Sequence, residues 1–210
     1  MYLAIAGGDP HRINELLKVL ENNGMEIVYA LSLGDLNDVR GYISGLKRAE
    51  KQTIFIRGCV EDYNLLKHFK YRYIDPYQRL FYLYGGPKVI KLEDELFVLA
   101  GIGGKELDRK EKRLILPLKD GLVDILLSHS KLPEDLLKLL KPRYYFYFSH
   151  KGEPPRYYGT TISVDLSVNS EGLLRLDGSS VGFLEVKTLR FFLLSKTYEL
   201  VPLTEVVKGN

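Results

Sequence analysis

The sequence lacks the features of several large protein classes. It has one cysteine among 210 residues, which excludes an internal disulfide framework and suits a reducing compartment. No run approaches the roughly 18 apolar residues of a membrane-spanning helix, and the N-terminus lacks the basic and apolar regions of a secretory signal. The net charge of +3 is too small to indicate a nucleic-acid partner by itself. These absences predict a cytoplasmic globular protein with no membrane association, and the few glutamines and many charged residues and tyrosines are typical of a thermophile.

Short aliphatic runs alternate with helical patterns over the first two thirds of the chain, which indicates α/β layering. The expected strands are 1–7, 25–34, 52–58, 122–130 and 143–150, with a hairpin at 89–104 that turns at 93–95. The expected helices are 10–24, 36–51, 61–69 and 133–141. After about residue 155, short alternating runs joined by Gly, Ser and Asn predict antiparallel strands. No linker or repeat interrupts the pattern, so one domain over residues 1–210 is expected.

Polar side chains follow the expected strands at the points where each gives way to a loop. These residues are Asp9, His11, Asp35, Cys59, Glu61, His129 and His150. Because α/β folds gather ligand sites at the carboxyl ends of strands, we expect several of these side chains to meet. Asp and His are hard oxygen and borderline nitrogen ligands, which suit manganese, iron or zinc. The pattern therefore predicts a metal site.

Each of these residues also has an ordinary structural interpretation. Asp9 is a plausible N-cap of the first helix, with Pro10 at the first helical position. His11 would then face solvent in the first turn, and Asp35 would cap the second helix. Cys59 could be a small buried apolar residue. The two later histidines, His129 and His150, could be satisfied by backbone groups.

Five of these segments, taken in order, resemble the motifs of the calcineurin-like metallophosphoesterases. The segments "GDPH", "GDLND", "RGCVED", "LLSHS" and "FSHKG" are similar to the family's D-x-H, G-D-x-x-D/N, G-N-H-D/E, lone His and G-H-x-H motifs. The late segment "DGSSVGFLEV" resembles the family's "NPGSVG" followed by a strand. This resemblance implies two mixed β-sheets sandwiched between helices (αββα). It also implies one or two divalent ions, manganese, iron or zinc, that share a carboxylate and activate a water against a phosphoester.

The resemblance also implies a role for each matching residue. Asp9 and His11 would bind the first metal, Asp35 would bridge both metals, and His129 and His150 would bind the second. Two departures concern the third motif: Cys59 replaces the family's Asn, and Val60 replaces its catalytic His. Valine cannot transfer a proton, so that general-acid position is empty, whereas a thiolate would favour zinc or iron over manganese.

A third departure lies in the final motif, where the last His falls on Gly152, or on Lys151 if the alignment slips by one.

The segment "LKPRYYFYFSH" resembles the RNA lariat debranching enzymes and the CwfJ-like phosphoesterase domains. Arg57 is a candidate for binding the substrate, or a salt-bridged support. The sequence thus predicts a hydrolase with a divergent active site, which cleaves a phosphomonoester or phosphodiester through metal-activated water.

The alternative is a catalytically impaired binding or scaffold module for RNA or a protein partner. Val60 and the shortened final motif favour it, whereas the retained Asp and His residues oppose it. The stretch 67–84 interleaves basic residues with Tyr and Phe, which can form an RNA-binding groove or merely a solvated sheet edge.

Overall fold

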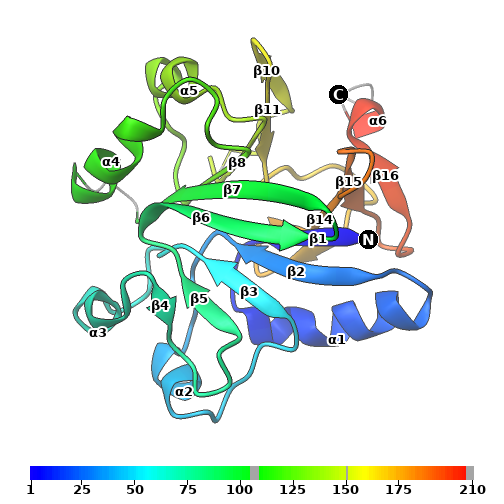
Figure 1. The fold of residues 1–210 in the computed structure, drawn as a ribbon. Helices are drawn as coiled ribbons and strands as arrows, with labels where there is room; N and C mark the ends of the chain where they lie inside the picture. The colour runs from blue at the N-terminus through cyan, green and yellow to red at the C-terminus, as the bar shows by residue number, and fades with distance from the viewer. Residues whose placement is uncertain (105–108, 150, 207–210) are drawn as a thin grey trace.

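The computed structural model describes residues 1–104, 109–149 and 151–206, which form two mixed β-sheets packed face to face with helices on their outer sides (Figure 1). The eight-stranded sheet has the order β16-β15-β14-β1-β2-β3-β5-β4. Its strands are β1 (Tyr2–Ala6), β2 (Ile27–Ser32), β3 (Gln52–Phe55), β4 (Arg72–Tyr73), β5 (Leu80–Tyr82), β14 (Gly182–Glu185), β15 (Phe191–Leu194) and β16 (Leu200–Pro202). Strands β1, β2, β3 and β5 are parallel, and the others pair antiparallel.

The second sheet has six strands in the order β10-β11-β9-β8-β7-β6. They are β6 (Gly85–Leu92), β7 (Glu95–Ile102), β8 (Ile125–Ser128), β9 (Tyr144–Tyr147), β10 (Arg156–Tyr158) and β11 (Thr161–Asp165). Strands β7, β8, β9 and β11 are parallel, and β6 and β10 are antiparallel edges. A separate ribbon pairs β12 (Arg175–Leu176) with β13 (Ser179–Ser180). The αββα arrangement predicted from the sequence is confirmed.

The main core lies between the two sheets, where alternate residues of each strand meet. On β1, Leu3 and Ile5 face this core, whereas Ala4 and Ala6 face the other side and pack against α1. Both faces of the parallel strands are therefore buried, as their continuous apolar runs predict.

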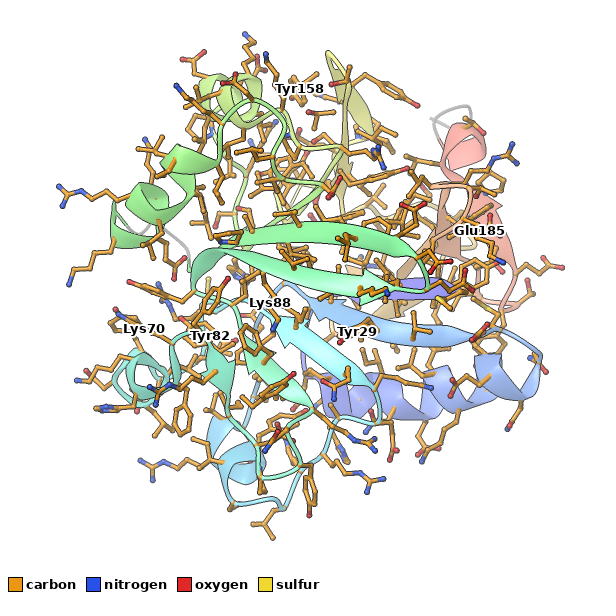
Figure 2. All side chains as sticks on the ribbon, viewed as in Figure 1. Tyr29, Lys70, Tyr82, Lys88, Tyr158 and Glu185 are labelled. Atoms are coloured by element: carbon orange, nitrogen blue, oxygen red, sulfur yellow. The ribbon has the colours of Figure 1, made fainter. Side chains whose placement is uncertain are left out.

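At one margin of the core, the ammonium of Lys88 on β6 lies 4.4 Å from the ring centre of Phe81 on β5; Figure 2 labels Lys88 beside these strands.

Helices cover the outer faces of both sheets. They are α1 (Pro10–Asn22), α2 (Val39–Ile43), α3 (Tyr63–Leu66), α4 (Arg109–Ile115) and α5 (Glu134–Leu140), with 3₁₀ turns at Lys67–Phe69 and Leu116–Leu118. The short helix α6 (Leu203–Val206) instead packs Leu203 into the core between the sheets. Helix α1 packs on the larger sheet through Ile13, Leu16, Leu17 and Leu20, a spacing that places them on one face. Helices α4 and α5 lie on the opposite side of the sandwich (Figure 1). No helix in the described ranges is long and apolar enough to cross a bilayer.

Two expectations from the sequence need correction. The helix expected over 36–51 is only Val39–Ile43, because Gly45 adopts a φ of +78° just after it and the chain turns there. The strand β11 pairs parallel with β9, although antiparallel pairing was expected beyond residue 155. The chain reaches β11 through β10, a tight antiparallel hairpin, and β11 therefore runs in the same direction as β9.

Candidate metal centre

Three potential metal ligands meet where the two sheets end. Asp35 follows β2, Cys59 follows β3, and His129 directly follows β8. One ligand atom from each of them lies within 4.8 Å of the others. Among the described residues, this is the one group of three or more His, Cys, Asp or Glu side chains close enough to share an ion. The carboxyl ends of strands thus bring together residues 94 positions apart in the chain, from Asp35 to His129.

The ring of His129 is fully buried and fixed in orientation. Its Nδ1 lies 2.7 Å from the backbone carbonyl of Leu33, and because a carbonyl can only accept, Nδ1 carries the proton and donates. The other ring nitrogen, Nε2, lies 3.1 Å from the Cys59 Sγ and 3.7 Å from the Asp35 Oδ1. A carbonyl that holds the other ring nitrogen is the usual partner of a metal-binding histidine.

The loops of Asp35 and Cys59 approach so closely that each needs a glycine. A Cβ added to Gly34 would lie 2.3 Å from the backbone nitrogen of Gly58, and one added to Gly58 would lie 2.2 Å from the backbone nitrogen of Asp35. The backbone N–H of Cys59 donates to the Asp35 Oδ1 at 2.7 Å. Asp35 itself has a φ of +67°, a conformation that Asp and Asn tolerate better than most residues. The two glycines therefore allow the carboxylate and the thiol to sit side by side.

Glu61 holds the same two loops from behind. Its carboxylate is buried and accepts the backbone N–H of Leu36 at 2.9 Å and that of Gly58 at 2.8 Å. Burial raises the pKa of Glu61, and the neighbouring charge of Asp35 adds to this, whereas the backbone hydrogen bonds oppose it. Glu61 is thus a buried support of the centre.

The Asp9 carboxylate lies at the end of β1, in a different environment. Asp9 is the N-cap of α1, and its Oδ1 accepts the backbone N–H of His11 at 3.1 Å and the hydroxyl of Tyr42. Its Oδ2 forms an ion pair with the Lys47 Nζ at 2.9 Å. Burial raises the pKa of Asp9, but the hydrogen bonds from Tyr42, Lys47 and His11 outweigh it and hold the pKa below its usual value. His11 is exposed, with its Nδ1 3.3 Å from the Arg48 carbonyl.

Three further predicted site residues have separate positions. The guanidinium of Arg57 lies over the ring of Tyr63, 5.0 Å from its centre, and no ion pair of Arg57 occurs within the described part of the chain. Val60 is 61% exposed, so nothing in the fold restricts the side chain at that position. His150 lies outside the described residues.

The sequence gives no sign that Tyr42 and Lys47 are partners of Asp9. They lie 33 and 38 residues from it in the chain, and no local pattern signals such a contact. Glu61 was predicted only as a strand-end residue, without a role. No local signal was available there, because Asp, Asn, Ser and Thr are the residues that typically accept nearby backbone N–H groups, and Leu36 lies 25 residues from Glu61.

Comparison with known proteins shows similarity in structure alone. No family model matches the chain, and no curated protein matches it. Among solved structures, it is similar to GAP50, the anchor in the inner membrane complex of Plasmodium, with a TM-score of 0.54 and 13% identity over 95% of this chain and 87% of that one. It is also similar to a putative 5'-nucleotidase from Staphylococcus aureus, with a TM-score of 0.50 and 11% identity over 97% of this chain and 54% of that one. The chain has the metallophosphoesterase fold.

A novel archaeal phosphodiesterase is a third similar structure, with a TM-score of 0.48 and 13% identity over 93% of this chain and 99% of that one. The likenesses to GAP50 and to the putative 5'-nucleotidase, at 13% and 11% identity, are likenesses of fold. Asp35, Cys59 and His129 are the described residues whose side chains meet closely enough to bind an ion in this fold.

Proposed function

We propose that this chain is a metal-dependent phosphoesterase that cleaves a phosphomonoester or phosphodiester. The observation that carries the proposal is the meeting of Asp35, Cys59 and His129 at the strand ends of a metallophosphoesterase fold. The two glycine-dependent loops and the buried Glu61 support these ligands. A group held in place by so many backbone contacts is preorganised to bind an ion.

The donor set fits a borderline or soft divalent ion. A carboxylate oxygen, an imidazole nitrogen and a thiolate sulfur favour zinc or iron over manganese. Such an ion, when bound, supplies Lewis acidity toward a phosphoryl oxygen and lowers the pKa of water. Asp35 and His129 would hold it, and the Leu33 carbonyl would keep Nε2 of His129 directed at it. Arg57, two residues before Cys59, would contribute positive charge toward the phosphate.

Val60 bears on the choice of substrate. Its side chain is exposed and has no titratable group, so this position cannot protonate a leaving group. An ester whose leaving group departs as a stable anion needs no such acid. Aryl phosphate esters such as bis-p-nitrophenyl phosphate and p-nitrophenyl phosphate are therefore the appropriate first substrates, and the pair separates diesterase from monoesterase activity.

The test compares hydrolysis of these esters by the wild type and by Asp35→Asn, with added zinc, iron(II) or manganese. Asparagine tolerates the positive φ of Asp35 and can still accept the Cys59 N–H, so this variant removes the charge and keeps the loop. We expect Asp35→Asn to lose bound metal and at least about 100-fold in kcat/KM, about 3 kcal/mol of transition-state stabilisation. Asp38→Asn, at an exposed carboxylate three residues away, is the matched control. Metal-independent hydrolysis, or none with any of these metals, would contradict the proposal.

A second variant tests the assignment of Cys59. Cys59→Asn replaces the sulfur donor by an amide oxygen, so we expect preference to move from zinc toward manganese. Cys59→Ser is the control for loss of the thiol alone. An unchanged order of metal preference in Cys59→Asn would show that Cys59 is not a ligand.

The second candidate function is a binding module for RNA or a protein. Val60 favours it, because the site has no proton donor at that position. For RNA, the basic residues of 67–84 are the natural contacts, but three of them already have intramolecular partners, and the first, Lys67, donates to the Asn64 side chain at 3.3 Å. Lys70 lies 4.1 Å from the ring centre of Tyr84, in the region where Figure 2 labels Lys70 and Tyr82, and Arg79 donates to the Glu50 carbonyl. An RNA affinity at low salt that falls when Lys70, Arg72 and Arg79 become Ala would support this candidate.

A further inference from the structure

Both oxygens of the Asp9 carboxylate are engaged by protein donors. Oδ1 accepts from the Tyr42 hydroxyl and the His11 backbone, and Oδ2 accepts from the Lys47 ammonium at 2.9 Å. The Asp9 side chain is 1% exposed, and that of Lys47 is 27% exposed. The buried negative charge is thus already neutralised within the fold, so it has no electrostatic need for a metal ion.

Residues near Asp9 on helix α1 form hydrogen bonds with the backbone of the segment 48–50. The Asn14 side chain donates to the Arg48 carbonyl at 2.8 Å and accepts the backbone N–H of Glu50 at 2.9 Å. The Nδ1 of His11 faces the same Arg48 carbonyl at 3.3 Å. Asp9 and His11 therefore belong to the contacts that fix the start of α1. Neither belongs to the group formed by Asp35, Cys59 and His129.

We infer that Lys47 takes the place of a metal at Asp9, and that the centre binds one ion, held by Asp35, Cys59 and His129. The inference rests on the proposed metal centre and specifies how many ions it holds. An ion at Asp9 would have to displace the ammonium, or lie beside it on the same buried carboxylate, where two cations repel. The fold therefore supplies a covalently attached positive charge at the end of β1 and leaves the exchangeable ion at the ends of β2, β3 and β8.

The number of ions per chain tests this inference without any measurement of catalysis. Reduced, metal-free protein is titrated with zinc, and bound metal is counted by elemental analysis after gel filtration. We expect one zinc per chain in the wild type, one in Asp9→Asn and none in Asp35→Asn. Two zinc ions per wild-type chain would overturn the inference and leave the proposed function standing. No zinc in the wild type would overturn the metal centre itself, so the two failures are distinguishable.

Replacing Lys47 tests its role directly. Lys47→Met keeps an aliphatic side chain and removes the ammonium, so Asp9 becomes available and we expect a second, weaker ion to bind. Equilibrium dialysis against zinc followed by elemental analysis would detect it as a change from one to two ions per chain. Lys47→Arg should restore a count of one. Lys51→Met is the control, because Lys51 is 25% exposed and pairs with Glu21 away from Asp9.

A count of one in a folded Lys47→Met protein would overturn the role of Lys47. Should Lys47→Met fail to fold, Asp9→Asn still decides the inference, since a loss of bound metal in that variant would show that Asp9 is a ligand.

Discussion

Asp9 and Asp35 follow neighbouring parallel strands, yet their carboxylates have different environments. Asp9 is buried against an ammonium and a phenol, whereas the Asp35 side chain is 34% exposed beside a thiol and an imidazole. The same residue type in equivalent motifs can thus be a buried helix cap or a potential metal ligand. Position at a strand end brings such residues together, but the local counter-charge decides which of them can bind an ion.

The largest effect is expected at His129, which lies beside Asp35 in the proposed metal centre. His129→Ala removes a ligand, leaves a cavity and deprives the Leu33 carbonyl of its donor. We expect zinc affinity to fall at least about 100-fold and the metal-free protein to lose about 2–3 kcal/mol of unfolding free energy. Chelator competition and urea unfolding measure the two quantities. The control His68→Ala, at an exposed histidine, should change neither the zinc affinity nor the unfolding free energy. An unaltered zinc affinity in His129→Ala would show that His129 is not a metal ligand.

The second effect concerns Asp9 as a structural residue. Asp9→Ala removes an N-cap and leaves Lys47 without its partner in a largely buried place, so we expect a loss of about 2–4 kcal/mol in unfolding free energy. Asp38→Ala is the matched control, because Asp38 caps α2 through a single bond to Gly41 at 2.8 Å and is exposed. That variant should lose about 0.5–1 kcal/mol. Equal losses in the two variants would mean that Lys47 and Tyr42 contribute nothing to the Asp9 environment.

The pH dependence of stability sharpens the contrast between the two buried carboxylates, because Asp9 and Glu61 are shifted in opposite directions. The pKa of Asp9 is lowered from 3.8, so its stabilisation is present above that value and is lost as pH falls through the folded-state pKa. The pKa of Glu61 is raised from 4.5, so its contribution is present below that value and is lost as pH rises through the folded-state pKa.

Urea unfolding between pH 3 and pH 8 measures both trends. The stability advantage of the wild type over Asp9→Asn should grow as pH rises from 3 to 5. Its advantage over Glu61→Gln should shrink as pH rises above 4.5. Parallel pH curves for the two comparisons would show that the environments do not differ as described.

Local patterns predicted the parts of the fold that depend on local physics. Helix α1, with Asp9 as N-cap and Pro10 at its start, is as expected, because capping and helical periodicity involve adjacent turns. The meeting of Asp35 and His129 was also predicted, because both follow the carboxyl ends of parallel strands, although β2 and β8 belong to different sheets. The Asp9–Lys47 pair was not, because it joins a strand end to a loop lysine, and any of the lysines could have filled that place.

The smallest effect is expected at His11, where we predict that removing the side chain changes neither the metal content nor, appreciably, the stability. His11 is exposed, and its Nδ1 makes two long contacts, with the Arg48 carbonyl at 3.3 Å and the Asn14 Nδ2 at 3.5 Å, whereas the buried Asn14 makes two shorter bonds to the segment 48–50. His11→Ala should therefore cost less than about 0.5 kcal/mol, and Asn14→Ala about 1–2 kcal/mol, in urea unfolding. Zinc content should remain one per chain in both variants. A histidine that held a first metal ion would differ in the metal count, because its removal would lower the zinc content below that of the wild type.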